Sequence, residues 1–460
     1  MTAGQVKYVY LLGAGGIGMS ALGRYFLKRG AVVFGYDKTE TEFTQRLQAE
    51  GMHLVYEDDP ETVPYEIQSG NAENTLLIYT PAVPMDSRIR QYLTTLKLPF
   101  YKRAEVLGLL SKGHATYAVA GTHGKTTTST LVAHILVEAG EKPVAFLGGI
   151  SANYDTNYLE GDAQSPLVAE ADEYDRSFLQ LHPAYSVITS TDADHLDIYG
   201  DAAALKEGFV QFARQTSKEG LLFIHDGIEV PEDIDRRAVR YSASGKAAVY
   251  ADNITLNGDC YRFDLCVGDK RLSNCELGMP GRHNLENAVA AAGICYMSGI
   301  SEDSIRKALG TFRGVKRRFE YIIRTKDQIF IDDYAHHPAE LRACIESVRA
   351  LYPSKRITGV FQPHLFSRTR DFMAGFAESL SLLDELILLE IYPAREVPIP
   401  GISSEALLRL INKIPAQLCA KQELTERIRE CNPEVLLTLG AGDIDAWVQP
   451  IKNILEGERL

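Results

Sequence analysis

Short apolar runs alternate with longer amphipathic stretches along most of this chain. Near the N-terminus, apolar runs at 6–12, 31–36 and 75–80 are separated by polar and helical stretches, one of them at 21–29. Runs of this length that end at Gly, Asp or Pro are typical of strands in a buried sheet. Strands that alternate with helices predict a parallel α/β sheet. We therefore expect the first block to be Rossmann-like.

The same alternation occurs in a second block. It predicts strands at 117–120, 166–169 and 185–190, and a helix that ends near Glu138, before Gly140. Residues 247–277 differ, because short β-rich runs there are broken at Asn257-Gly258 and at Gly268-Asp269, a pattern typical of hairpins. We expect a small antiparallel β insertion within this block.

A third block completes the pattern. Strands are predicted at 328–331, 357–361, 385–391 and 435–439, with a helix after Pro338. The sequence thus predicts three consecutive α/β domains, with a Rossmann-like fold in the first and last and a P-loop ATPase-like fold in the centre. We place them at residues 1–104, 105–314 and 315–460.

Composition narrows the classes of protein. At roughly 150 residues per domain, 460 residues suit three domains. With 45% hydrophobic and 24% charged residues the chain is globular, and its net charge of −13 argues against nucleic-acid binding. No apolar run is long enough to span a membrane, and the N-terminus lacks the pattern of a signal peptide. Seven cysteines without a C-x-x-C pair favour neither disulfides nor a zinc ribbon, so we expect a cytoplasmic protein without membrane insertion.

A glycine-rich segment follows the first predicted strand and matches G-x-G-x-x-G. Glycines permit close approach of the backbone to a ligand, and the start of the next helix favours a pyrophosphate. Asp37 ends the second strand, where an acid that binds ribose is expected. NAD and a nucleotide diphosphate sugar fit equally well, and a tight turn without a ligand is the structural alternative. The candidate binding residues are Gly13, Gly15, Gly16, Ile17, Gly18 and Asp37.

A second glycine-containing loop follows the strand at 117–120. It resembles a Walker A loop, although Val119 stands in the place of the first glycine. In such a loop, backbone N–H groups surround phosphate oxygens, Lys125 meets the β- and γ-phosphates, and Thr126 reaches Mg²⁺. The candidate ATP-binding residues are Gly121, Thr122, His123, Gly124, Lys125, Thr126 and Thr127.

Two further polar residues follow predicted strands of the same block. Glu170 comes after the strand at 166–169, and His195 after the strand at 185–190. If these strands run parallel to the strand before the Lys125 loop, all three end at one edge of the sheet, where ligands bind in open α/β folds. Thr126, Glu170 and His195 are therefore candidate Mg²⁺ ligands, with helix caps or surface groups as the alternative for Glu170 and His195.

Eight segments occur in an order that resembles the Mur ligase family of peptidoglycan synthesis. They are GAGGIGMSALG, GTHGKTTT, EADEYDRSF, DADHLDIYG, GRHNLENAVAA, GVKRRFE, DDYAHHPAEL and FQPHLFSRTRDF, from residue 13 to residue 372. The resemblance is strongest to the branch that adds L-alanine. It implies that the first domain binds UDP-N-acetylmuramate, the second ATP, and the third the amino acid together with part of the nucleotide. The first glycine loop then holds a UDP pyrophosphate rather than NAD.

The resemblance also assigns roles to single residues. Asn284 and Asn287 are expected to contact the nucleotide, although an N-cap is the structural alternative for Asn284. Arg318 is expected to reach the phosphates, and Asp333 the ribose.

The expected amino-acid pocket consists of Tyr334, His336, His364 and Arg368, in which Arg368 pairs with the carboxylate of alanine. Leu365 departs from the pattern, because relatives often carry Arg at this position. The expected catalytic residues are Lys125, Glu170, His195, Arg318, His336 and His364.

The implied reaction is ATP-dependent ligation of L-alanine to the lactyl carboxylate of UDP-N-acetylmuramate through an acyl phosphate, with Mg²⁺ and with the chain as a monomer or a homodimer. Because the expected residues lie on both sides of residue 314, we expect the third domain to close over the site. Three alternatives stay open. They are a ligase of the same family that attaches a recycled tripeptide, an NAD-dependent dehydrogenase, and a non-catalytic nucleotide-binding regulator.

Overall fold

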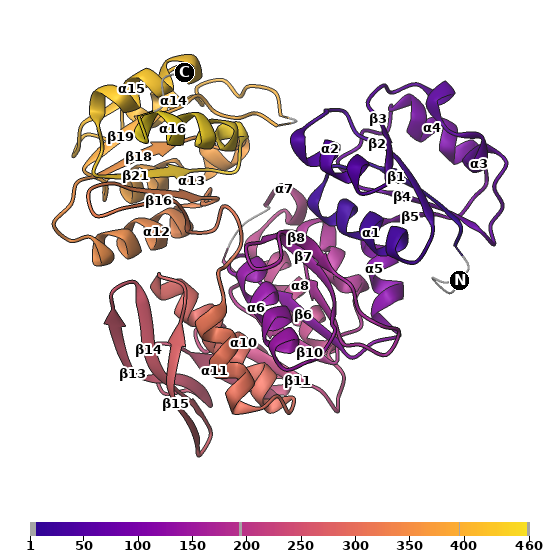
Figure 1. Ribbon diagram of the computed structural model, residues 1–460, viewed down its shortest axis with the longest axis horizontal. Helices are drawn as coiled ribbons and strands as arrows, with labels where there is room; N and C mark the ends of the chain where they lie inside the picture. Colours follow the sequence, from indigo (N-terminus) through magenta and orange to yellow (C-terminus); the bar gives the residue numbers. More distant parts are fainter. Residues whose placement is uncertain (1–5, 193–195, 395, 458–460) are drawn as a thin grey trace. The chain divides into compact units, whose positions relative to one another are not determined.

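Three β-sheets organise the computed structural model, which describes residues 6–192, 196–394 and 396–457 (Figure 1). The sheets have five, ten and six strands and follow one another along the chain. The predicted succession of three α/β domains is confirmed, whereas the boundaries near residues 104 and 314 stay predictions.

By contacts between its residues, the chain forms two compact units. The first comprises Met1–Ile254, Phe263–Glu276 and Glu286–Phe312, and the second comprises Thr255–Arg262, Leu277–Leu285 and Arg313–Leu460. In the described residues, no helix combines the length and the apolarity needed to cross a bilayer.

The first sheet is entirely parallel, in the order β3-β2-β1-β4-β5. The chain leaves β1 for one side of the sheet and later returns to pair β4 on the other, so the loop after β1 lies where the strand order reverses. The strands are β1 Tyr8–Leu12, β2 Val32–Tyr36, β3 His53–Val55, β4 Thr75–Tyr79 and β5 Phe100–Lys102. The helices are α1 Ile17–Lys28, α2 Glu42–Ala49, α3 Tyr65–Gln68, α4 Arg88–Thr95 and α5 Arg103–Ser111.

The central sheet has the order β15-β14-β13-β12-β11-β10-β6-β9-β7-β8. Strands β9, β6 and β10 are parallel neighbours, as the sequence predicted for the strands that precede the candidate site. The strands are β6 Thr116–Ala120, β7 Val144–Ser151, β8 Thr156–Leu159, β9 Leu167–Glu170, β10 Tyr185–Ile188, β11 Leu221–His225, β12 Ala238–Ser242, β13 Val249–Asn257, β14 Cys260–Val267 and β15 Lys270–Leu277. The helices are α6 Lys125–Glu138, α7 Leu196–Tyr199, α8 Ala202–Gln215, α9 Glu232–Asp235, α10 Arg282–Met297 and α11 Glu302–Thr311.

The hairpin-like insertion at 247–277 extends the central sheet, because β13 pairs in parallel with β12. Its two turns lie where Gly258 and Gly268 adopt positive φ angles of 66° and 53°. Glycine adopts such angles at low cost, which explains why the two Gly-containing pairs marked these turns in the sequence.

The third sheet has the order β16-β17-β21-β18-β19-β20, and only the pairing of β16 with β17 is antiparallel. Helices surround its central strands (Figure 1). The strands are β16 Glu320–Arg324, β17 Ile329–Asp333, β18 Ile357–Phe361, β19 Glu385–Leu388, β20 Ala416–Leu418 and β21 Val435–Leu439. The helices are α12 Pro338–Leu351, α13 Phe366–Leu380, α14 Ser404–Leu408, α15 Leu424–Cys431 and α16 Val448–Leu455.

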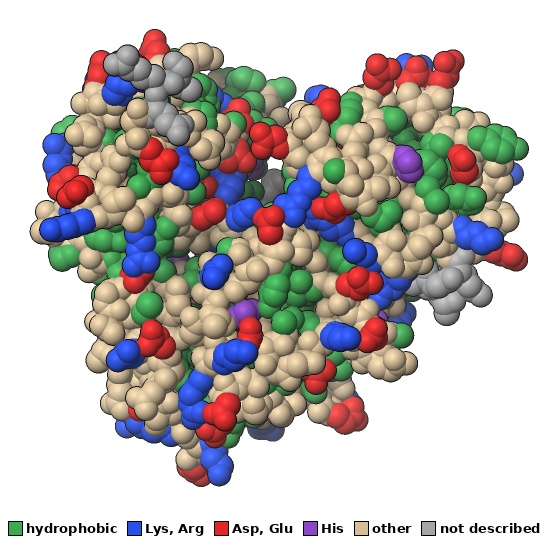
Figure 2. Space-filling view, viewed as in Figure 1, with side chains coloured by type: hydrophobic (Ala, Val, Ile, Leu, Met, Phe, Trp, Pro, Cys, Tyr) green, Lys and Arg blue, Asp and Glu red, His purple; other side chains and the backbone are tan. Residues whose placement is uncertain are grey.

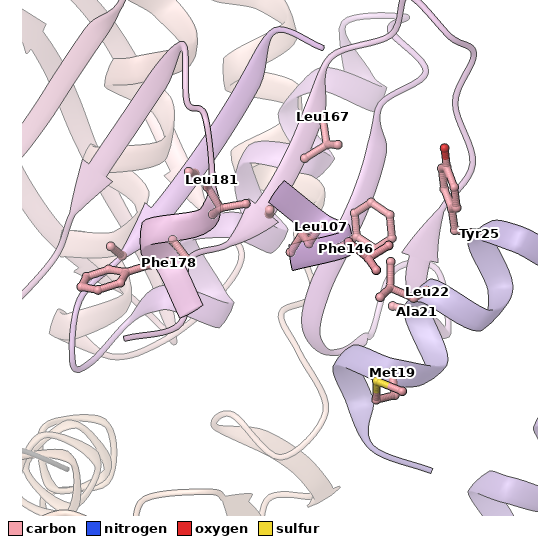
Figure 3. Close-up of a cluster of buried hydrophobic side chains, with 14 of the residues drawn as sticks. Met19, Ala21, Leu22, Tyr25, Leu107, Phe146, Leu167, Phe178 and Leu181 are labelled. Carbon is pink, nitrogen blue, oxygen red and sulfur yellow. The ribbon is translucent and has the colours of Figure 1, made fainter. Parts of the chain in front are cut away.

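One apolar core joins the first sheet to the central sheet within the first unit. Leu22 of α1, Leu107 of α5 and Phe146 of β7 belong to the same buried cluster, and Figure 3 shows these side chains close together. Polar contacts reinforce this core, because the buried Asn157 of β8 donates to the Ile17 carbonyl (2.6 Å) and to Ser20 Oγ (3.0 Å). The helix that follows the first glycine loop is therefore fixed against the domain that carries the second.

Candidate active site

The first glycine loop is held by β2. The backbone N–H groups of Gly13 and Ala14 donate to the Tyr36 carbonyl (2.8 and 3.0 Å), and Gly15 N–H donates to Asp37 Oδ2 (2.7 Å). Gly13 has a φ of 85°, which favours glycine at this turn. Asp37 therefore shapes the loop in this structure, and its expected contact with a ribose stays a prediction.

The second glycine loop lies between β6 and α6 and is braced by the residues after β10. Gly121 and Gly124 have φ angles of 137° and 80°. Ser190 Oγ accepts from His123 N–H (2.8 Å) and lies 2.9 Å from Thr122 Oγ1. Thr189 Oγ1 also donates to the His123 carbonyl. The loop is thus shaped by a neighbouring strand end as well as by its own glycines.

Lys125 lies at the start of α6 and is largely buried, with 13% of its side chain exposed. Its Nζ donates to the Gly121 carbonyl (2.7 Å) and to both carboxylate oxygens of Glu173 (3.0 and 2.7 Å). Burial by itself lowers the pKa of Lys125, but the charges of Glu173, Asp172 and Glu170 outweigh it and raise that pKa above its usual value. The ammonium group stays charged, as a phosphate-binding group requires.

Thr126 and Glu170 meet as the sequence predicted for parallel strand ends. Thr126 Oγ1 donates to Glu170 Oε2 at 2.7 Å. A hydroxyl and a carboxylate oxygen this close suit Mg²⁺, which prefers oxygen ligands and commonly takes others from phosphates and water. Among the described residues, no group of three or more His, Cys, Asp or Glu side chains could hold a metal. The third expected ligand, His195, lies outside the described residues.

Gly148 of β7 makes the space that Glu170 occupies. A Cβ atom at Gly148 would lie 1.8 Å from Glu170 Oε2 and 2.4 Å from its Cδ. The sequence contained no pattern for this contact, because it joins residues of two different strands.

Glu173 is a functional candidate that the sequence analysis missed. It is fully buried and pairs with Lys125, and its carbonyl accepts from Tyr199 Oη at 2.7 Å. After Tyr174, Asp175 and Arg176 have φ angles of 53° and 54°, which non-glycine residues adopt rarely. The segment EADEYDRSF pointed to the site, but the charge partner of Lys125 appears only in the tertiary structure.

The two candidate asparagines lie in α10 and are buried. A Cβ atom at Gly124 would lie 2.5 Å from Asn287 Oδ1, which places Asn287 beside the second glycine loop. Asn284 Nδ2 donates to the Pro280 carbonyl (2.6 Å), so this residue ties the start of α10 to the preceding turn.

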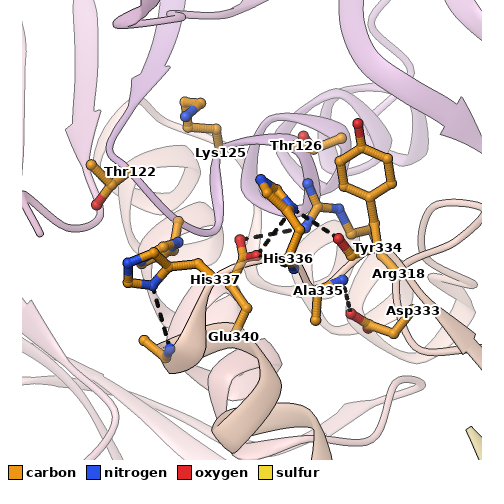
Figure 4. Close-up of polar contacts among 12 residues, drawn as sticks. Thr122, Lys125, Thr126, Arg318, Asp333, Tyr334, Ala335, His336, His337 and Glu340 are labelled. Carbon is orange, nitrogen blue, oxygen red and sulfur yellow. Dashed lines mark hydrogen bonds and ion pairs between the residues drawn. The ribbon is translucent and has the colours of Figure 1, made fainter. Parts of the chain in front are cut away.

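In the second unit, Glu340 of α12 links the candidate residues near β17 (Figure 4). Its Oε2 accepts from His336 N–H (3.0 Å), and its Oε1 lies 3.8 Å from Arg318 NH1. The Arg318 guanidinium also lies 4.9 Å from the centre of the Tyr334 ring. Glu340 was overlooked, although Pro338 at the start of a helix followed by Glu in its first turn resembles the capping-box pattern.

His336 is held in one orientation. Its Nδ1 lies 2.9 Å from the Tyr334 carbonyl, an acceptor, so Nδ1 carries the proton and Nε2 presents its lone pair. Burial, together with the charges of Arg368 and Arg318, lowers the pKa of His336 to about 3, and Glu340 opposes this only in part. His336 is therefore neutral at physiological pH.

Asp333 is buried at the end of β17 and binds the backbone with both carboxylate oxygens. Oδ2 accepts from Phe319 N–H (2.7 Å) and Oδ1 from Ala335 N–H (2.8 Å). Burial raises the pKa of Asp333 to about 6, while Arg318 and the two hydrogen bonds lower it. The carboxylate thus connects the turn that carries Arg318 to the turn before α12, and its expected contact with a ribose stays a prediction.

Arg368 and His364 are neighbours at the start of α13. Arg368 NH1 lies 3.4 Å from His364 Nδ1, and the His364 ring stacks on Tyr392, with ring centres 5.8 Å apart. Leu365 between them has a φ of 71°, an uncommon angle for a bulky residue. The backbone departs from its usual range at the same position where the sequence departs from the family pattern.

The arrangement in each unit suits a different part of one reaction. In the first unit, a buried ammonium, a threonine hydroxyl and a carboxylate lie at the start of a helix, which suits a triphosphate. In the second unit, a guanidinium and a neutral imidazole suit a small zwitterion that carries a carboxylate and an amine.

Models of one protein family match most of the chain. The model of the Mur ligase family catalytic domain matches residues 8–115, the Mur ligase middle domain residues 119–295, and the Mur ligase glutamate ligase domain residues 317–443.

Individual proteins are similar over nearly the whole length. A UDP-N-acetylmuramate–L-alanine ligase of Parabacteroides distasonis is 46% identical over 457 residues, which cover 99% of this chain and 98% of that protein. The crystal structure of a UDP-N-acetylmuramate–alanine ligase from Thermotoga maritima superposes with a TM-score of 0.82 at 27% identity, covering 98% of this chain and 99% of that one. A murein peptide ligase from Psychrobacter arcticus has a TM-score of 0.73 at 21% identity, covering 99% and 100%, a likeness of fold alone.

We predict that Gly148→Ala weakens the Mg²⁺ site. The added methyl group cannot coexist with the Glu170 carboxylate in its present position, so the carboxylate moves away from Thr126. The Mg²⁺ concentration for half-maximal binding of a non-hydrolysable ATP analogue should rise about 10- to 100-fold. Gly245→Ala is the control, because no atom lies within 4 Å of its added Cβ. Equal Mg²⁺ requirements in both variants would contradict this role of Gly148.

We predict that His336 makes the second unit sensitive to acid. Its pKa is about 3 in the folded chain and about 6.5 when unfolded, so the unfolded state binds the extra proton between these values. The contribution of His336 to the free energy of unfolding is fully present above pH 6.5. It decreases as the pH falls towards 3, by up to about 1.4 kcal/mol per pH unit.

The test is urea unfolding followed by the fluorescence of Trp447, the single tryptophan. His336→Asn keeps an N–H donor near the position of Nδ1 and should lose less stability than the unmodified chain between pH 7 and pH 5. His53→Asn, which changes an exposed histidine, should retain the full pH dependence. The prediction would be refuted if the free energy of unfolding changed with pH by the same amount in His336→Asn and in the unmodified chain.

Proposed function

This chain belongs to the Mur ligase family, and from that premise we propose that it joins L-alanine to the lactyl carboxylate of UDP-N-acetylmuramate in an ATP-dependent reaction. The proposal rests above all on the 46% identity with an L-alanine ligase across 99% of the chain. The residues around Lys125 in the first unit and those around Glu340 in the second supply the chemical groups that such a reaction needs.

In the first step, the lactyl carboxylate attacks the γ-phosphorus of ATP, the bond to ADP breaks, and an acyl phosphate forms. Lys125 offsets the charge of the β- and γ-phosphates, and the first N–H groups of α6 bind phosphate oxygens. Thr126 and Glu170 would hold Mg²⁺, which would supply further positive charge to the phosphates.

The contact between Lys125 and Glu173 gives the buried cation a partner that a phosphate can replace. Glu173 is a positioning residue in this proposal, because it keeps Nζ charged and directed at the loop. Tyr199 Oη donates to the backbone carbonyl of Glu173, and the Glu173 side chain is completely buried. Both features limit the movement of the carboxylate.

In the second step, the neutral amine of L-alanine attacks the acyl carbon and forms the amide C–N bond, the C–O bond to phosphate breaks, and the leaving phosphate takes up the proton that the amine loses. Arg368 pairs with the carboxylate of alanine, and His336 accepts a hydrogen bond from its amine through Nε2. With a pKa of about 3, His336 orients the amine and does not store its proton. Arg318 lies beside Tyr334 and offsets charge on the phosphate. His364 lies beside His336 and Arg368, near the amine.

We place this reaction in the cytoplasm, where ATP and nucleotide sugars are available, with the chain acting as a monomer or a homodimer. In this proposal the reaction requires ATP, UDP-N-acetylmuramate, L-alanine and Mg²⁺.

The function is tested by release of phosphate from ATP in the presence of UDP-N-acetylmuramate and one amino compound at a time. We expect release with L-alanine at least 100-fold faster than with a tripeptide, and none without the nucleotide sugar. L-Ser and Gly complete the panel. Faster turnover with L-Ala-γ-D-Glu-linked tripeptide would favour the recycling ligase. Phosphate release that does not depend on the nucleotide sugar or on the amino compound would overturn the proposal.

We predict that Arg368→Lys raises the KM for L-alanine about 10- to 100-fold, because an ammonium cannot form the two parallel hydrogen bonds that a guanidinium forms with a carboxylate. The KM for ATP should stay within about twofold. Arg370→Lys, on the same helix but exposed and paired with Asp371, is the matched control. An unchanged KM for L-alanine in Arg368→Lys would remove Arg368 from the pocket.

A further inference from the structure

One arginine outside the recognised motifs lies directly against the first glycine loop. A Cβ atom at Gly18 would lie 2.6 Å from Arg103 NH1, 2.9 Å from its Cδ and 3.0 Å from its Cζ. Gly18 is absent from the residues with positive φ, so its backbone conformation does not call for glycine. The last glycine of the motif is therefore needed for the close approach of the Arg103 guanidinium.

The position of Arg103 is determined by the apolar core. Arg103 is the first residue of α5, and Leu107 follows one turn later on the same face of the helix. Leu107 is 5% exposed and belongs to the buried cluster that contains Met19 and Leu22 of α1 (Figure 3). This packing directs the face of α5 that carries Arg103 towards the start of α1.

Arg103 also joins the two glycine-loop sites electrostatically. Its NH2 lies 3.6 Å from Asp172 Oδ2, with 23% of the arginine side chain exposed. Asp172 lies between Glu170, which contacts Thr126, and Glu173, which contacts Lys125. At 3.6 Å the ion pair is longer than a hydrogen bond, so Asp172 orients the guanidinium and leaves its N–H donors available for a stronger acceptor.

The Arg103 guanidinium brings positive charge to the start of α1. The chain has a net charge of −13, and on the face drawn in Figure 2 basic and acidic side chains are interspersed. A three-quarters-buried arginine beside a helix start suits an anion, because the guanidinium and the first N–H groups of the helix both carry positive charge.

We propose that Arg103 is a substrate-binding residue that donates hydrogen bonds to the pyrophosphate of the UDP-sugar at the first glycine loop. The inference rests on the proposed function, since it needs a UDP-sugar at that loop. It assigns the pyrophosphate rather than the lactyl carboxylate, because the guanidinium lies on Gly18, in the first turn of α1. Asp172 is a positioning residue that couples this arginine to the segment of Glu170 and Glu173.

Two nucleotide sugars separate the pyrophosphate from the carboxylate. UDP-N-acetylmuramate carries both anions, whereas UDP-N-acetylglucosamine carries the pyrophosphate without the lactyl group. Their dissociation constants are measured by calorimetry on the full-length chain, with competition against UDP-N-acetylmuramate for the weaker ligand. We expect Arg103→Ala to weaken both about 10- to 100-fold, with Arg103→Lys between it and the unmodified chain. Binding of an ATP analogue should stay within about twofold, which a general loss of folding would not allow.

Gly18→Ala provides a second measurement through the same contact. The added methyl group displaces the guanidinium while the arginine remains present, so this variant should also lose affinity for both sugars. The double variant Gly18→Ala/Arg103→Ala should bind no more than about twofold more weakly than the weaker of the two single variants. Arg88→Ala, which removes an exposed arginine of the same domain, should bind like the unmodified chain.

Three results would overturn the inference. They are normal affinity in Arg103→Ala, a loss confined to UDP-N-acetylmuramate, and fully additive losses in the double variant. If the unmodified chain itself bound neither sugar and released no phosphate, the proposed function would fail instead, so the two failures are distinguishable.

Discussion

The positive charge of Lys125 is buried beside the ends of the parallel strands β9, β6 and β10, where it needs negatively charged or polar partners. A buried ammonium is costly without a partner, and here two oxygens of Glu173 and the Gly121 carbonyl surround it. The carboxylates come from the end of β9 and the segment after it, beside β6. The order of the strands therefore supplies the charge balance on which nucleotide binding depends.

The segment from Glu170 to Arg176 supplies contacts to residues at both glycine loops. Glu170 contacts Thr126 in the space left by Gly148, Glu173 pairs with Lys125, and Asp172 faces Arg103. Two successive left-handed residues end this run. Such strain persists where the surrounding contacts hold it, and here these contacts reach both glycine loops. The core that joins α1, α5 and β7 keeps the two loops in one unit.

The second unit uses a different principle, since its groups are oriented mainly by hydrogen bonds to the backbone. His336 is kept neutral by burial and held by the Tyr334 carbonyl, and Asp333 binds two backbone N–H groups. Glu340 connects the backbone of His336 with the side chain of Arg318. A small amino acid suits such a site, because its carboxylate can pair with a guanidinium and its amine can donate to an imidazole.

The sequence by itself determined the succession of strands and helices, both glycine loops and the pairing of Thr126 with Glu170. These follow from apolar periodicity and from the rule that parallel strands end at one edge, which are local or nearly local properties. Glu173, Gly148 and Arg103 emerged only from the tertiary structure. Each acts through a partner between 22 and 85 residues away, and no spacing along a chain specifies which of many acids or glycines a fold will bring into contact.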